Sequence, residues 1–191
     1  MTTSASVVKQ FQVEKLKVPN AEIIKAPIFV DHRGSLYESF HILKLRTTCS
    51  VSKIYGIYPA RHVVYGPVSH TGEEYMYIIR GKLFVALLDH QNPQINDMLE
   101  VSPGEILRIP SGCIHAFLAL EDDTVFDIVR TIGAENPHSY AIDDPTLNIP
   151  WPPSEQPLTQ STSFHLTQDS NLKERPSYAI MGSTGMIGSA F

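Results

Sequence analysis

The stretch that decides the fold runs from Gly104 to Phe117 and reads GEILRIPSGCIHAF. Gly104 and Gly112 permit tight turns on either side of a short apolar run, and Pro110 fixes the direction in which the chain leaves it. The next apolar segment begins directly after the second turn and carries His115. This spacing predicts two consecutive β-strands, with the histidine of the second strand aimed into the interior.

The sequence on both sides, from about residue 20 to residue 132, also consists of short apolar runs separated by turn residues. Short runs rich in Ile, Val, Leu, Tyr and Phe are bounded by Gly, Pro, Asp or Asn, which is the pattern of β-strands. They read SKIYGIYPA, EYMYIIRG, KLFVALLD, EILRIP and HAFLAL. No part of this region has the caps and 3.6-residue period of a long helix. Many short strands with frequent turns predict an all-β sandwich or barrel.

The run KLFVALLD, residues 82–89, is apolar on both of its alternating faces. A strand with two apolar faces is expected between two layers of structure rather than at a surface. Gly81 separates this run from EYMYIIR, and its position predicts a hairpin between the two strands.

Five quoted segments carry a resemblance to known proteins. GEILRIPSGCIH and GPVSHTGEEYMYIIRG, residues 66–81, resemble the two cupin motifs. FVDHRGSLYESF (29–40), IPSGCIHAF (109–117) and IDDPTLNIPW (142–151) resemble, in the correct order, three motifs of the dTDP-4-dehydrorhamnose 3,5-epimerases. The resemblance implies a cupin or jelly-roll β-barrel, a double-stranded β-helix, over residues 20–151 with a polar C-terminal tail.

The resemblance also implies an activity. Such an isomerase acts on a nucleoside-diphosphate 4-keto-6-deoxy hexose in deoxysugar and rhamnose biosynthesis, and inverts C5 with C3 as a second centre. A base removes the acidic hydrogen next to the ketone, and the resulting enolate is protonated from the opposite face. The family uses a His oriented by an Asp as base, a Lys at the enolate oxygen and a Tyr as acid. It implies no cofactor, a homodimer and a cytoplasmic location.

Several residues of this sequence match motif positions of the family. The resemblance implies that Phe29, Arg33, Glu38 and Tyr65 contact the nucleotide sugar. His115 and Asp144 fall on positions implied to be catalytic.

The standard catalytic set of the family is incomplete in this chain. The family motif R-G-L-H becomes Tyr65-Gly66-Pro67-Val68, so the phosphate-binding Arg and the base are both replaced. The Lys position falls on or near Glu74, and the Tyr position falls near Val129. A carboxylate beside a developing enolate is repulsive, so Glu74 replaces Lys only if it is protonated or bound to a metal.

Two alternative sites remain open at this point. In the first, His70 acts as the base with Asp144 orienting it, because His70 follows Val68 by two residues on the same predicted strand face. In the second, His70, Glu74 and His115 bind a divalent metal as a two-His-one-carboxylate set with open positions for substrate.

Three functions fit these residues. Besides the epimerase, the segment KIYGIYPARHVVYGPVSHTGEEY, residues 53–75, resembles the sugar 3,4-ketoisomerases, and a metal-dependent cupin is the related enzyme alternative. The third is a catalytically silent module that binds nucleotide sugar or promotes dimerisation.

Composition excludes several other classes. The 191 residues are 42% hydrophobic and 18% charged with a net charge of −5, and no long basic run marks a nucleic-acid site. No apolar stretch is long enough to span a bilayer, and the first residues lack a secretion signal. Cys49 and Cys113 stand in unrelated contexts, which favours a reduced cytoplasm over a disulfide scaffold.

The C-terminal part differs from the rest of the chain in composition. Residues 152–177 are polar and without apolar periodicity, which predicts a linker. Residues 178–191, YAIMGSTGMIGSAF, have the strand-then-GxxGxxG form that opens a dinucleotide-binding unit and resemble the start of the 4-keto-rhamnose reductases. Such a unit needs about 30 residues. NADPH is therefore expected only if a full reductase domain follows, and a reductase domain or partner is a further expectation.

Overall fold

The computed structural model describes residues 11–37, 50–132 and 137–161. Within these ranges the chain forms strands, turns and loops only, and no helix suited to crossing a membrane occurs among them. The prediction of an all-β fold is confirmed. Glu38 and residues 162–191, which include most of the predicted linker and the whole glycine-rich ending, lie outside the described ranges.

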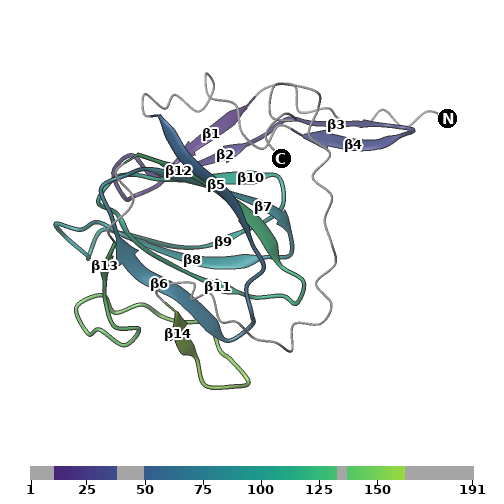
Figure 1. The fold of residues 1–191 in the computed structure, drawn as a ribbon. Coiled ribbons are helices and arrows are strands. Elements are labelled where there is room, and N and C mark those ends of the chain that lie inside the picture. The colour runs from purple at the N-terminus through teal and green to yellow at the C-terminus, as the bar shows by residue number, and fades with distance from the viewer. Residues whose placement is uncertain (1–10, 38–49, 133–136, 162–191) are drawn as a thin grey trace, which may run out of the picture.

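Two main sheets make up the barrel. The first has the order β1 (Gln12–Lys15), β2 (Glu22–Lys25), β10 (Glu105–Ile109), β7 (Glu74–Arg80), β12 (Val125–Thr131) and β5 (Val51–Ile57). The second has the order β13 (His138–Ser139), β6 (Val63–Ser69), β11 (Ile114–Ala119), β8 (Leu83–Leu88) and β9 (Asn96–Val101), with β14 (Thr159–Ser161) parallel to β6. The two sheets lie face to face, as Figure 1 shows.

The main core lies between the two sheets. Met76 and Ile78 of β7 and Phe126 of β12 pack there against Leu83 and Val85 of β8. The opposite face of β8 is buried as well, against a second apolar cluster that includes Trp151. The predicted burial of this strand between two layers is therefore confirmed.

The segment after β13 covers the outer face of the second sheet. The Trp151 ring lies 5.8 Å from the ring of Phe84, and its indole N–H donates a hydrogen bond of 3.0 Å to the carbonyl of Ile142. Beyond Trp151, in the predicted linker, β14 pairs with β6 from Thr159 to Ser161. The barrel therefore extends at least ten residues past Trp151, to residue 161.

The hairpin predicted at Gly81 is wrong. Gly81 does turn the chain, with a φ of +78°, but β7 belongs to the first sheet and β8 to the second. A side chain at Gly81 would meet Thr124 Oγ1 at 2.4 Å, so the turn packs closely on the loop before β12. The turn is a crossover between sheets, which local sequence does not distinguish from a hairpin.

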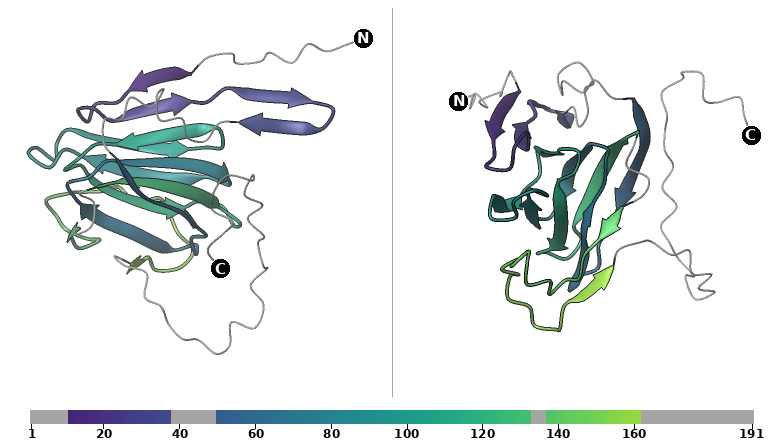
Figure 2. Two further views of the ribbon diagram at one scale, coloured as in Figure 1. Left: turned by 45° about the horizontal axis from the view of Figure 1, so that its top comes forward. Right: turned by 90° about the vertical axis from the view of Figure 1, so that its left-hand side faces the viewer.

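A short hairpin projects from the barrel. It consists of β3 (Ile28–Asp31) and β4 (Gly34–Tyr37), which form a sheet of their own, and the left view in Figure 2 shows it extending away from the main sheets. Phe29 and Leu36 face each other across the two strands, and their side chains are 46% and 62% exposed. An exposed pair of apolar side chains on adjacent strands indicates a surface that another part of the protein or a second molecule can cover.

Candidate active site

A cavity of about 530 Å³ opens between the two sheets at the end of the barrel core. The alternation of the strands decides which residues line it, because every second side chain of an interior-facing strand points inward. The lining residues are Lys53, Tyr55, Ile57, Tyr65, Gly66, Val68, Glu74, His115, Phe117, Ile128, Arg130, Pro137 and Ser161.

Glu74, the first residue of β7, is the buried charge of this cavity, with its side chain 1% exposed. Its Oε1 accepts a hydrogen bond of 2.5 Å from Arg130 Nε and forms an ion pair with Arg130 Nη2. His70 Nε2 lies 3.0 Å from the same oxygen, and His115 Nε2 lies 3.5 Å from Oε2. Burial alone raises the pKa of Glu74, but the contact with His70 and the electrostatic influence of His115, Arg130 and His70 lower it to about 2.

Both histidines are held in the same tautomer. His70 Nδ1 lies 3.1 Å from the carbonyl of Gly72, and His115 Nδ1 lies 3.1 Å from the carbonyl of Cys113. A carbonyl only accepts hydrogen bonds, so Nδ1 carries the hydrogen in each ring and Nε2 faces Glu74. Burial lowers the pKa of His115 despite the attraction of Glu74, so its Nε2 presents a lone pair at neutral pH.

One carboxylate oxygen in this cluster has no hydrogen-bond donor. Glu74 Oε2 is buried and unpartnered, and His70 Nε2 likewise lacks a partner in hydrogen-bond geometry. An unsatisfied buried acceptor is costly, and such atoms in a cavity mark a place where a ligand donates a hydrogen bond. A sugar hydroxyl that reaches Glu74 Oε2 would satisfy this oxygen.

The side chains of His70, Glu74 and His115 are of the types that bind metal ions in proteins. His70, Glu74 and His115 each offer one ligand atom, and these atoms lie within 4.8 Å of one another. The Arg130 guanidinium, however, already contacts Glu74 Oε1, so the carboxylate that a divalent ion would need is paired with another positive charge. The donor set fits a metal, whereas the local charge opposes one.

Gly66 allows the two strands that carry the cavity wall to approach each other. Its φ is +91°, and a Cβ there would lie 2.6 Å from the carbonyl oxygen of His115. The pairing of β6 with β11 shifts register at this point, between the pairs His115–Val68 and Phe117–Tyr65. A glycine at this position therefore places His115 directly beside Val68.

The structure brings three of the predicted site residues into the cavity. Glu74, His115 and Tyr65 line it, and Val68 adds an apolar wall where the family base would stand. His70 lies behind Glu74, with its side chain 1% exposed, and does not belong to the lining residues.

Other predicted site residues lie away from the cavity. The Asp144 carboxylate accepts hydrogen bonds from the backbone N–H and hydroxyl of Thr146, and it borders a different hollow, beside Trp151. The structure therefore does not bring Asp144 to His70. Phe29 and Arg33 lie on the β3–β4 hairpin, where the exposed Arg33 guanidinium forms an ion pair with Asp31.

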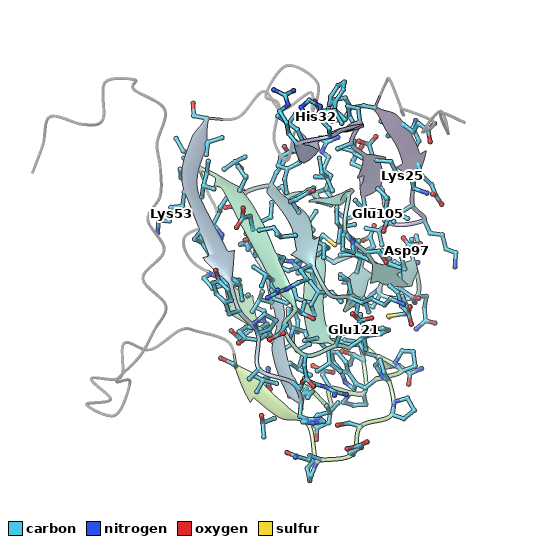
Figure 3. All side chains as sticks on the ribbon, turned by 90° about the vertical axis from the view of Figure 1, so that its right-hand side faces the viewer. Lys25, His32, Lys53, Asp97, Glu105 and Glu121 are labelled. Atoms are coloured by element: carbon cyan, nitrogen blue, oxygen red, sulfur yellow. The ribbon has the colours of Figure 1, made fainter. Side chains whose placement is uncertain are left out.

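The ionisable cavity residues that the sequence prediction misses are Lys53, Tyr55 and Arg130. Arg130 lies two positions after Ile128 on β12, and both side chains face the cavity, while Val129 packs on the outer face of the sheet. A charged residue on the inward period of an apolar strand was the available signal. Lys53 lies on the edge strand β5 (Figure 3) and lines the same cavity.

Acid is expected to destabilise the fold through Glu74. Its folded pKa of about 2 lies below the ordinary 4.5, so its stabilising effect is complete above pH 4.5 and disappears as the pH falls from 4.5 towards 2. Chemical denaturation between pH 7 and pH 3 should show the free energy of unfolding falling, with a limit of roughly 3 kcal/mol for a shift of this size. A Glu74→Gln variant should lose this part of the pH dependence. An unchanged pH profile in that variant would contradict the assignment.

We compared the chain with protein families, with curated proteins and with solved structures. A family model described as dTDP-4-dehydrorhamnose 3,5-epimerase matches residues 15–174. No curated protein matches the chain at the level of sequence.

Solved structures show the same fold at low sequence identity. A dTDP-6-deoxy-D-glucose-3,5-epimerase of Legionella pneumophila, in complex with dTDP-4-keto-L-rhamnose, has 23% identity and a TM-score of 0.71 over 80% of this chain and 88% of its own. A 4-keto-6-deoxy sugar epimerase of Streptomyces spheroides has 17% identity and a TM-score of 0.69 over 84% and 87%. A Streptococcus suis protein in complex with dTDP-D-xylose has 16% identity and a TM-score of 0.67 over 80% and 88%. The jelly-roll prediction is thereby confirmed.

Proposed function

Because the chain belongs to the dTDP-4-dehydrorhamnose 3,5-epimerase family, we propose that it epimerises a dTDP-linked 4-keto-6-deoxy hexose in the cavity around Glu74 and His115. The family is one of isomerases, and two of its similar structures hold dTDP-sugars. The observation that carries the proposal is the neutral His115 Nε2 beside an ionised, buried carboxylate. This arrangement suits removal of a proton from carbon.

His115 is the base in this proposal. Its Nε2 lone pair takes the hydrogen from the carbon next to the ketone, and the imidazolium that forms lies beside Glu74 Oε2. Arg130, with its side chain 24% exposed, keeps N–H groups that its contacts with Glu74 do not use. These donors can stabilise negative charge on the ketone oxygen as the enolate forms.

His70 is less suited to this role. Its ring lies behind Glu74 and outside the cavity lining, so a sugar in the cavity meets Glu74 and His115 first. The proposed pairing of His70 with Asp144 has no support from the geometry, since Asp144 borders a different hollow.

The proposed reaction uses no cofactor, because proton removal and return need only acid and base groups. A divalent ion bound to His70, Glu74 and His115 is the alternative that the ligand distances favour. In that case the metal would polarise the ketone as a Lewis acid, and the protein would act as a metal-dependent cupin or a 3,4-ketoisomerase-like enzyme. The contact of Arg130 with Glu74 makes this the weaker candidate.

A homodimer gives the β3–β4 hairpin a role. Phe29 and Leu36 are exposed on it, and Arg33 stands at its turn, away from the chain's own cavity. A second copy that covers this hairpin would bury the apolar pair and bring Arg33 to a bound diphosphate, whose geometry matches a guanidinium. We place this dimer in the cytoplasm, upstream of a reductase that accepts the epimerised ketone.

Exchange of solvent deuterium into the sugar tests the function. After incubation with dTDP-4-keto-6-deoxyglucose in heavy water, mass spectrometry should show deuterium at C5, with C3 as the second position. Exchange that persists after treatment with a chelator supports the metal-free reaction, and exchange that stops supports the metal-dependent alternative. Binding of the nucleotide sugar without any exchange would leave only the silent binding module.

A further inference from the structure

The cavity contains one tyrosine hydroxyl that no other group of the described protein engages. Tyr55 on β5 lines the cavity, and no hydrogen bond to its hydroxyl occurs within the described ranges. Tyr65, the other cavity tyrosine, is hydrogen-bonded to the backbone of Ala60 instead. A half-buried, unengaged hydroxyl in a catalytic cavity is available to a substrate.

Tyr55 also stands on the wall opposite the proposed base. It belongs to β5 in the first sheet, whereas His115 belongs to β11 in the second sheet. Tyr55 on β5 pairs with Ile128 on β12. Two residues along the same strands, Lys53 pairs with Arg130. The β12 side chains that line the cavity are thus Ile128 and Arg130, neither of which is an ordinary proton donor.

Two cationic side chains line the same part of the cavity as Tyr55. The Arg130 guanidinium carbon is 5.5 Å from the centre of the Tyr55 ring. Lys53 is two residues from Tyr55 on the same strand face, and it forms no ion pair with any carboxylate of the described chain. Positive charge around a phenol stabilises the phenolate that remains after the proton has been donated.

From this arrangement we propose that Tyr55 is the catalytic acid, delivering a proton to the face of the enolate opposite His115. His115 breaks the C–H bond and keeps the proton, and the electron pair moves into the enolate. The Tyr55 O–H bond then breaks as a new C–H bond forms on the other face, which inverts the carbon. The phenolate, held near Arg130 and Lys53, regains a proton from water at the mouth of the cavity. Burial first and the charge of Glu74 second raise the pKa of Tyr55 to about 12, so the hydroxyl is protonated before each turnover.

The inference rests on the proposed function, and a Tyr55→Phe variant separates the two. The variant keeps the ring and loses only the hydroxyl. Deuterium exchange should continue in it, because His115 can return a deuteron to the face from which it took the proton. Formation of the inverted sugar, followed by NMR coupling constants, should fall by roughly 100-fold or more. The dTDP affinity, measured by calorimetry, should stay within about twofold of wild type and so report an intact fold.

Tyr58→Phe is the matched control, because Tyr58 is 60% exposed just after β5 and does not line the cavity. It should form inverted sugar at the wild-type rate. Wild-type inversion in Tyr55→Phe would overturn the assignment, and so would loss of exchange together with inversion while dTDP still binds. Absence of exchange in the wild-type protein itself would instead refute the proposed function.

Discussion

Replacing His115 by alanine is expected to reduce deuterium exchange into the 4-keto sugar by roughly 100- to 10,000-fold, the usual effect of losing a general base. The His115 Nδ1 contact with the Cys113 carbonyl leaves Nε2 as the free lone pair, and burial lowers the pKa of the ring so that it is neutral. Among the described residues that line the cavity, His115 is the only histidine. The variant should still bind dTDP, because the nucleotide does not need the base.

The measurement is the initial rate of exchange by mass spectrometry, with dTDP affinity measured in parallel. His62→Ala is the control, since His62 lies at the surface with Nδ1 2.5 Å from the Ser154 hydroxyl. A His115→Ala variant that binds dTDP and exchanges at the wild-type rate would remove His115 from the reaction. The base would then have to be sought at His70.

Removing the carboxylate of Glu74 should have the largest effect on stability. A Glu74→Met variant leaves the Arg130 charge without its buried partner. Breaking one side of a buried ion pair costs about 3–5 kcal/mol, and the partial exposure of Arg130 sets the expectation near the lower limit. For a chain of this size the melting temperature should fall by roughly 10 °C, measured by calorimetry.

A double-mutant cycle distinguishes loss of the pair from loss of packing. Adding Arg130→Met to Glu74→Met should recover part of the lost stability, because the double variant no longer contains an unpaired charge. Glu100→Gln serves as the control. It breaks a surface ion pair with Lys82 in which the Glu100 side chain is 59% exposed, so it should cost less than about 1 kcal/mol. A loss from Glu74→Met as small as that of the control would show that the buried cluster does not hold the barrel together.

Much of the barrel can be predicted from local sequence. The turn glycines at residues 104 and 112 both have positive φ, and the strand between them forms as expected. The two apolar faces of residues 83–88 correspond to two apolar clusters. Such features depend on periodicity and turn geometry, which neighbouring residues determine. Which sheet a strand joins depends on pairing with distant strands, so local sequence predicts a hairpin at Gly81 where the structure has a crossover.

The site was harder to predict than the fold. Strand alternation predicts His70 on the same face as Val68 only if the strand continues to residue 70, but β6 ends at Ser69. His70 therefore turns towards Glu74 instead of sharing the cavity face of Val68. Asp144 was assigned through a motif, whereas its carboxylate caps a local turn at Thr146. Tyr55 and Arg130 lie outside the motifs on which the prediction of the site rests, although both are on inward-facing strand positions.

Deuterium exchange by the wild-type protein tests most directly whether this cavity enolises a nucleotide-linked 4-keto sugar. The protein should be incubated with dTDP-4-keto-6-deoxyglucose in heavy water, with chelator present, and the sugar analysed by mass spectrometry with position assigned by NMR. The expected result is deuterium at C5, with C3 as the second position, together with inverted product. A sugar that binds and stays fully protonated, with its configuration unchanged, would contradict it.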